Sequence, residues 1–154
     1  MKLIIGADHR GADAAARLGE RLSRAGHEIR ILAPGPGEAC DYPEPAYIAG
    51  SAVARGEAER AILICGTGVG MCIAANKIPG VRAASVHDEI TAEISRTHND
   101  ANVICLSADL LGQRLIEQIV DTWLRTAFAG GRHERRLRKI EAIERGQDPR
   151  SVGN

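Results

Sequence analysis

Short apolar runs alternate with longer segments of helical period along almost the whole chain. Five runs have the length and composition of strands, at 3–7, 29–32, 61–65, 82–86 and 102–106. Helical periodicity lies between or after them, at about 11–25, 44–56, 69–77, 89–98 and 110–127. Strands joined by helices pair in parallel. The pattern therefore predicts an α/β fold, a Rossmann-like three-layer α/β/α sandwich around a five-stranded parallel sheet.

The length of 154 residues predicts a single domain over residues 1–146. The segment 33–45 holds four of the six prolines and two glycines, so we expect a loop there. A last helix is expected at about 131–146, and residues 147–154 are expected to form a flexible tail.

Charge and cysteine usage limit the classes of function. Lys plus Arg and Asp plus Glu both number 20, so no overall field favours nucleic acid or an anionic membrane as a partner. No apolar stretch approaches the 18 or more residues of a membrane helix.

Four cysteines without C-x-x-C or metal-ligand spacing fit a reduced, cytoplasmic setting with no metal site. The ordinary interpretation of Cys72 and Cys105 is a buried apolar side chain.

Chemically unusual residues follow the predicted strands, where ligands bind in open parallel sheets. Asp8 and His9 follow the first strand, and Cys65 begins the glycine-rich loop 65–70 after the third. His98 and Asn99 close the fourth strand-helix unit. We expect acid, thiol, hydroxyl and imidazole groups to converge on this edge.

The loop 65–70 has the sequence CGTGVG at a strand-to-helix turn, where backbone amides can point at an oxyanion. It lacks the lysine of a phosphate-binding P-loop and the glycine spacing of a dinucleotide site, so nucleotide binding is the second choice. The helix that follows favours the thiolate form of Cys65, which would make it a base or nucleophile. An inert core cysteine is the alternative.

The other candidates each have a structural alternative. His98 ends a helix whose Ile90 and Ile94 are expected on the apolar face, so it can simply pack there. Asp8 and His9 can form a local turn, or act in acid-base chemistry and anion binding. Arg132 and Arg136 share a helix face and suit a phosphate, although a solvated basic face is the usual meaning of such a run.

Taken together, these motifs resemble the family of type B ribose-5-phosphate isomerases and galactose-6-phosphate isomerase subunits. The similarity covers almost the whole chain. It rests on GADHRG at 6–11, DYP at 41–43, ICGTGVG at 64–70, AANK at 74–77, SRTHNDAN at 95–102 and GGRH at 130–133.

The resemblance implies an aldose-ketose isomerase without cofactor or metal, acting on ribose 5-phosphate or another four- to six-carbon aldose phosphate. It implies that Cys65 removes the proton from C2 of the sugar, that His98 opens the ring and that Thr67 assists proton movement between oxygens. Backbone amides would stabilise the enediolate. The implied substrate-binding residues are Asp8, His9, Tyr42, Gly66, Gly68, Val69, Gly70, Asn99, Arg132 and Arg136. A non-catalytic nucleotide- or sugar-phosphate-binding module is the alternative from another class.

The resemblance further implies the strand order 2-1-3-5-4. It implies a homodimer or homotetramer with shared active sites, in which His98 and Asn99 reach into the partner's site.

Three positions depart from the family pattern. Ala12 and Ala15 replace larger residues, and Asp109 stands where ribose-phosphate enzymes usually carry an arginine aimed at phosphate. Asp109 would either repel the phosphate or cap a helix beginning near Leu110.

Overall fold

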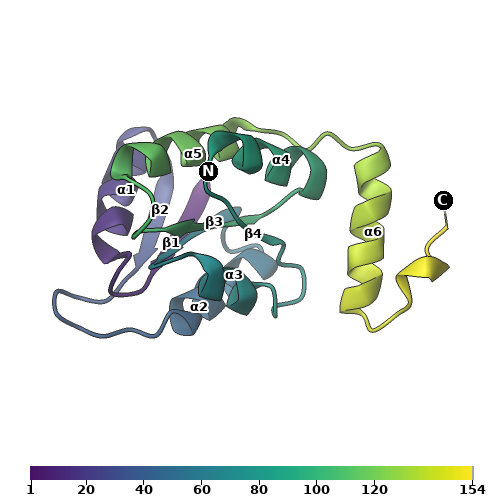
Figure 1. Ribbon diagram of the computed structural model, residues 1–154, viewed down its shortest axis with the longest axis horizontal. Helices are drawn as coiled ribbons and strands as arrows, with labels where there is room; N and C mark the ends of the chain where they lie inside the picture. Colours follow the sequence, from purple (N-terminus) through teal and green to yellow (C-terminus); the bar gives the residue numbers. More distant parts are fainter. Residues whose placement is uncertain (154) are drawn as a thin grey trace.

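Five parallel strands form one sheet in the order β2-β1-β3-β5-β4 in the computed structural model, which describes residues 1–153 (Figure 1). This confirms the predicted fold class and the strand order implied by the resemblance. The strands are β1 (Lys2–Ala7), β2 (Glu28–Leu32), β3 (Arg60–Cys65), β4 (Ala83–Ser85) and β5 (Val103–Ser107). Each lies within three residues of its predicted bounds.

Helices cover both faces of the sheet. One face carries α1 (Ala12–Arg24), α4 (Glu89–Asn99) and α5 (Gln113–Arg125), and the other carries α2 (Pro43–Ala54) and α3 (Val69–Ala75) (Figure 1). The two cores are almost entirely aliphatic, and Trp123 of α5 is the large exception. On the second face Ala46, Ala49 and Ala52 are buried, so small side chains let α2 lie close to the sheet.

Three local expectations are corrected. The loop after β2 ends before Pro43 because α2 begins there, and proline is tolerated in the first turn, where its missing N–H has no helical partner. The fifth helix begins at Gln113 with Gly112 as its N-cap, so Asp109 does not cap it. Ile90 and Ile94 are exposed, whereas Ala92, Ser95 and Arg96 are the buried residues of α4.

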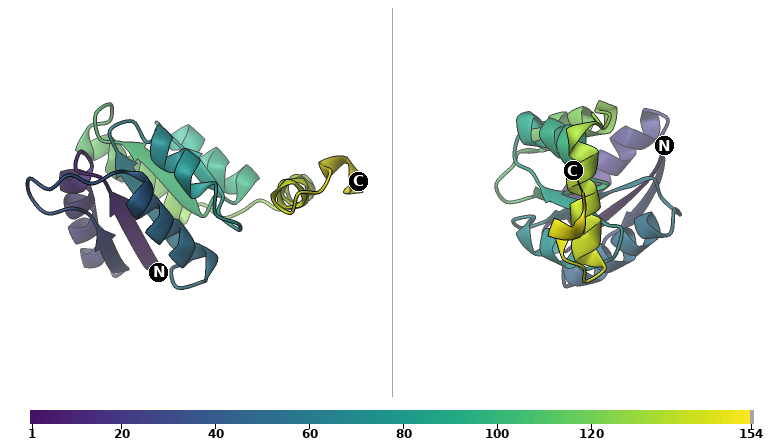
Figure 2. Two further views of the ribbon diagram at one scale, coloured as in Figure 1. Left: turned by 90° about the horizontal axis from the view of Figure 1, so that it is seen from below. Right: turned by 90° about the vertical axis from the view of Figure 1, so that its right-hand side faces the viewer.

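The last helix, α6 (Arg132–Glu144), stands apart from the three layers, as Figure 1 and both views of Figure 2 show. It packs mainly against α4 and the short 3-10 helix η1 (Pro149–Ser151). Glu144 accepts a hydrogen bond from the backbone N–H of Gly80 at 2.8 Å. The single-domain assignment and the flexible tail stay predictions, and residue 154 lies outside the described residues.

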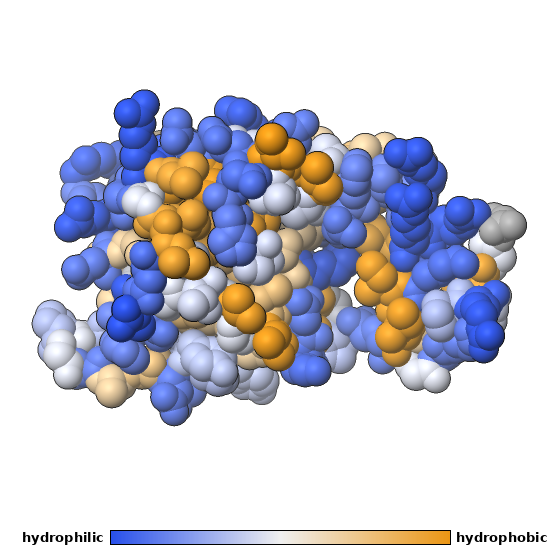
Figure 3. Space-filling view, viewed as in Figure 1, coloured by the Kyte–Doolittle hydropathy of each residue, from blue (hydrophilic) through white to orange (hydrophobic). Residues whose placement is uncertain are grey.

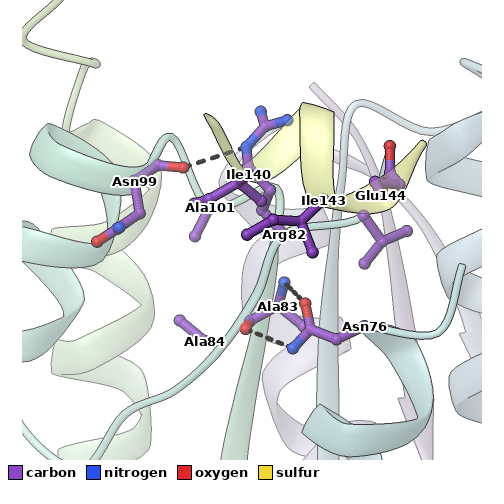
Figure 4. Close-up of a pocket in the computed structure, with 10 residues that line it drawn as sticks. Asn76, Arg82, Ala83, Ala84, Asn99, Ala101, Ile140, Ile143 and Glu144 are labelled. Atoms are coloured by element: carbon purple, nitrogen blue, oxygen red, sulfur yellow. Dashed lines mark hydrogen bonds between the residues drawn. The ribbon is translucent and has the colours of Figure 1, made fainter. Parts of the chain in front are cut away.

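A cavity of about 400 Å³ lies between α6 and the edge of the sheet at β4 (Figure 4). Ile140 and Ile143 line it from α6, and both are exposed. Figure 3 shows apolar atoms on the side of α6 that faces the body of the protein. Within residues 1–153, none of the helices combines the length and apolar character needed to cross a membrane.

Candidate active site

The carboxyl ends of β1, β3 and β5 bring three predicted residues together, Asp8, Cys65 and Gly66. Cys65 pairs with Ser107 at the ends of β3 and β5. The N–H of Asp8 donates to Ile64 O at 3.3 Å, and the N–H of Asp109 donates to Gly66 O at 3.1 Å. These bonds join the three strand-end loops, so the expected meeting of the acid, the thiol and the glycine loop at this edge is confirmed.

Cys65 lies at the base of the glycine loop with only 3% of its surface exposed. Its Sγ accepts a hydrogen bond from the N–H of Gly68 at 3.2 Å. Gly68 has a φ of +78°, and a Cβ there would lie 3.1 Å from the backbone of Leu106. A left-handed backbone closed in by β5 requires glycine. The turn therefore aims the amide of Gly68 at the thiol of Cys65.

Thr67, Val69 and Tyr42 complete the loop and its cover. The N–H of Val69 donates to Thr67 Oγ1 at 3.4 Å, and α3 begins at Val69. A Cβ on Gly70 would lie 2.6 Å from the ring of Tyr42, so the ring rests directly on this glycine. The structure thus brings Tyr42, Thr67, Val69 and Gly70 together around the turn that holds Cys65.

Asp8 and His9 both make local contacts. Asp8 is buried, and its Oδ1 accepts from the N–H groups of Arg10 at 2.9 Å and Gly11 at 3.0 Å. His9 Nδ1 lies 3.2 Å from the carbonyl oxygen of Cys40. A carbonyl only accepts, so Nδ1 carries the hydrogen in this contact. Among residues 1–153, Asp8 Oδ2 and His9 Nε2 have no hydrogen-bond partner, which leaves these two atoms for a ligand.

Arg10 is a residue whose role the sequence interpretation missed. Its Nε lies 2.9 Å and its Nη2 2.8 Å from Asp109 Oδ2, and Nε is 3.1 Å from Oδ1. Asp109 thus neither faces the loop as an unpaired anion nor caps a helix, which replaces both expectations for it. The signal in the sequence was the position of Arg10 between two motif residues, His9 and Gly11, directly after the first strand.

Ser107, the last residue of β5, is a second residue that was missed. Its Oγ donates to Gly66 O at 2.6 Å and accepts from the N–H of Leu110 at 3.0 Å. The hydroxyl thereby fixes the first peptide of the glycine loop. No local pattern marks this role, because it depends on the pairing of β5 with β3.

His98 and Asn99 lie at the opposite edge of the sheet. The carbonyl of Asn99 accepts from Nε of Arg82 at 3.1 Å, and Arg82 directly precedes β4 (Figure 4). A helix that follows a parallel strand runs back along it, so its C-terminus reaches the amino edge of the sheet. The expectation that His98 joins Asp8 and Cys65 on one edge is therefore wrong for a single chain.

His98 instead belongs to a second cluster with the start of α6. Its ring stacks on His133 with centroids 4.2 Å apart and planes 11° from parallel. Burial lowers the pKa of His133, and so do the charges of His98, Arg132 and Arg136. The two predicted phosphate-binding arginines thus accompany the predicted ring-opening histidine, away from the glycine loop.

Cys72 differs from the inert apolar residue that the sequence predicted. It is partly exposed on α3, and hydrogen bonds from Cys105, the backbone at Ser85 and Asn76 lower its pKa to about 7 against the opposing effect of burial. Cys105 is buried, which raises its pKa, and fits the prediction. Within the described part of the chain, no group of three His, Cys, Asp or Glu side chains is arranged to hold a metal ion.

Comparison with known proteins relates this site to a family. The family model described as Ribose/Galactose Isomerase matches residues 3–140. Ribose-5-phosphate isomerase B of Escherichia coli is 41% identical over 143 residues, which cover 93% of this chain and 96% of that protein. D-erythrulose-4-phosphate isomerase of Pectobacterium atrosepticum is 38% identical over 145 residues, with 94% and 95% covered. The structure of Clostridium thermocellum ribose-5-phosphate isomerase B superposes with a TM-score of 0.93 and 43% identity, covering 95% of this chain and 99% of the other.

Proposed function

Because the chain belongs to the ribose/galactose isomerase family and is a sugar-phosphate isomerase, we propose that it interconverts ribose 5-phosphate and ribulose 5-phosphate. Family membership excludes the alternative of a non-catalytic binding module. The observation that carries the proposal is the thiol of Cys65 held against the N–H of Gly68, in a loop whose Gly70 is covered by the ring of Tyr42. The relatives with ribose-5-phosphate isomerase names support the choice of sugar.

In the proposed reaction Cys65, as a thiolate, takes the proton from C2 of the open-chain aldose phosphate. The electron pair of that C–H bond forms the C1–C2 double bond of a cis-enediolate, and the charge moves to the oxygen on C1. Backbone amides of the loop from Gly66 to Gly70 stabilise this oxyanion. Thr67 passes a proton between the two oxygens, and Cys65 returns its proton to C1 to give the ketose.

Substrate binding is proposed for the residues around this thiol. Asp8 and Tyr42 would hold hydroxyl groups and line the pocket, and His9 would bind the phosphate through Nε2. Buried Asp8 is suited to a fixed contact because two N–H groups already orient its carboxylate. Val69 and the loop glycines would contribute their backbone amides.

The remaining proposed residues come from a second subunit. His98 would open the furanose ring, Asn99 would hold a hydroxyl, and Arg132 with Arg136 would bind phosphate. In one chain these residues lie at the amino edge of the sheet or on α6, whereas Cys65 lies at the carboxyl edge. A homodimer that sets the α4–α6 cluster of one chain against the glycine loop of the other would complete two equivalent sites.

Exposed apolar side chains support this assembly. Val69 and Ile73 of α3, Ile90 of α4, and Ile140 and Ile143 of α6 are each more than 40% exposed. Exposed apolar side chains on α3, α4 and α6 support a protein interface. We also propose a cytoplasmic location, which the four free cysteines support.

The test is a panel of aldose phosphates with ketose formation followed for the purified protein. The proposal expects the highest kcat/KM for ribose 5-phosphate. A higher kcat/KM for erythrose 4-phosphate would instead indicate a substrate preference like the one named for its relative, D-erythrulose-4-phosphate isomerase. Turnover of none of the four- to six-carbon substrates would refute the proposed reaction.

A further inference from the structure

We propose that Arg10 is a further substrate-binding residue, which contacts the phosphate group of the sugar phosphate with the edge of its guanidinium that Asp109 leaves free. This inference rests on the proposed function, because it assigns a contact to the substrate of the same site. Arg10 belongs to the same chain as the glycine loop that it contacts, whereas the proposed phosphate-binding residues Arg132 and Arg136 would come from the second subunit.

The ion pair fixes the guanidinium at the loop. Nε and Nη2 of Arg10 both contact the carboxylate of Asp109, and the N–H of Asp109 is bonded to Gly66 O. A Cβ on Gly66 would lie 3.2 Å from both Cδ and Nε of Arg10. The guanidinium is therefore in van der Waals contact with the residue that follows Cys65, and its orientation is set before any ligand binds.

The pair lies on the far side of the loop from the thiol. Successive residues at a strand end point to opposite faces of the sheet. The side chain of Cys65 belongs to the apolar cluster under α2 and α3, whereas a side chain at Gly66 would point at Arg10 and Asp109. Arg10 thus stands away from the carbon that loses its proton, which suits contact with the phosphate at the other end of the sugar.

One edge of the guanidinium is open. More than half of the Arg10 side chain is exposed, and within residues 1–153 its Nη1 has no hydrogen-bond partner. Next to it is His9, whose Nε2 is also left for a ligand. Asp109 raises the pKa of Arg10 further, so the group is a cation at every relevant pH.

The surrounding charges define how the contact is made. Arg10 and His9 also line a cavity of about 600 Å³ together with Asp13 and Glu38, and the two carboxylates do not favour an anion inside it. Because Asp109 cancels the net charge of the pair, the contact would work mainly through directed hydrogen bonds from Nη1 and Nη2. The phosphate is therefore expected above Gly66, not within the cavity.

The experiment measures the Kd of inorganic phosphate by calorimetry for the wild-type protein, Arg10→Gln and Arg10→Lys. Arg10→Gln is expected to weaken phosphate binding about tenfold and Arg10→Lys by less, since lysine keeps the charge but not the fork. In turnover, Arg10→Gln should raise KM for ribose 5-phosphate with little change in kcat, and leave kcat/KM for unphosphorylated ribose unchanged.

The matched control is Arg55→Gln. Arg55 is exposed and pairs with Glu57 through Nε and Nη2, but it lies at the end of α2, away from the glycine loop. An unchanged phosphate Kd in Arg10→Gln, or an equal weakening in Arg55→Gln or Arg10→Lys, would overturn the inference. So would an equal loss of kcat/KM on ribose 5-phosphate and ribose. If the wild-type protein turned over no aldose phosphate, the proposed function would fail while the phosphate titration still tested Arg10.

Discussion

At the scale of single residues, the site depends on how a few side chains are held by backbone groups. The Sγ of Cys65 accepts from Gly68, Asp8 accepts from two N–H groups, and His9 is oriented by a carbonyl. Each contact is made before a substrate arrives, so these groups do not have to be ordered on binding. At the same scale Cys72, which the sequence analysis interpreted as a buried apolar side chain, is a partly exposed thiol with a lowered pKa.

Replacing Cys65 by alanine is expected to abolish isomerisation and the exchange of the C2 proton with solvent. The variant loses the base but not the binding groups, so the Kd for ribose 5-phosphate should change by less than about tenfold. Proton exchange in D2O, followed by NMR, measures the chemical step directly. Cys72→Ala is the control and should keep exchange, whereas persistent exchange in Cys65→Ala would exclude this base.

The alkylation rate of Cys72 is expected to rise as the pH passes through about 7, because its lowered pKa makes the thiolate the main form above that value. Mass spectrometry after short exposure to iodoacetamide at a series of pH values gives this titration. Replacing Asn76 by alanine removes one of the stabilising hydrogen bonds and should move the midpoint upward. A midpoint that does not move would mean that Asn76 has no part in the shift. Because Cys72 is also expected to react near neutral pH, loss of activity on alkylation of the whole protein does not identify Cys65 as the catalytic thiol.

At the scale of elements, the turn from β3 into α3 joins the thiol to the rest of the site. The strand delivers Cys65, the left-handed Gly68 reverses the backbone, and Tyr42 from the start of α2 packs on Gly70. Ser107 of β5 holds the first peptide of the turn. The loop is thus specified by three elements that are distant in the sequence.

Gly68→Ala is expected to destabilise the protein and remove its activity. The left-handed backbone alone costs about 1 to 2 kcal/mol with a Cβ, and contact with the backbone of Leu106 adds to this. Gly80→Ala is the matched control for Gly68→Ala, because Gly80 also has a left-handed backbone, with a φ of +82°, but open space around its Cβ position. Denaturant unfolding should show a smaller loss for Gly80→Ala, with activity kept. Equal losses of stability and activity in the two variants would contradict the special role of the turn.

At the scale of the whole molecule, the proposed machinery is divided between two edges of one sheet. Cys65 lies at the carboxyl edge, whereas His98 lies at the amino edge beside α6. The helix α6 stands apart, with exposed Ile140 and Ile143 above a cavity at β4 (Figures 1 and 4). A second subunit is the simplest way to cover these surfaces and to join the two halves of the site.

Mixing the inactive variants Cys65→Ala and His98→Ala is expected to restore activity. A heterodimer would contain one site with both changes and one intact site, so equal amounts should recover roughly a quarter of the wild-type activity after subunit exchange. Light scattering would establish the dimer, and an activity assay before and after exchange would measure the recovery. No recovery from subunits that demonstrably exchange would place both residues in one subunit's site.

The sequence by itself determined the fold class and most of the element bounds, because strand and helix periodicities are local and alternate without interruption. It also determined the cluster at the carboxyl edge, since Asp8 directly follows β1 and Cys65 ends β3, and the ends of these parallel strands must meet. Tertiary structure decided the rest. The role of Ser107 depends on strand pairing, and the pairing of Arg10 with Asp109 joins loops 99 residues apart in the chain. His98 lies at the opposite edge of the sheet because of the direction of α4. A helix that returns along a sheet carries its last residues away from the carboxyl ends of the strands.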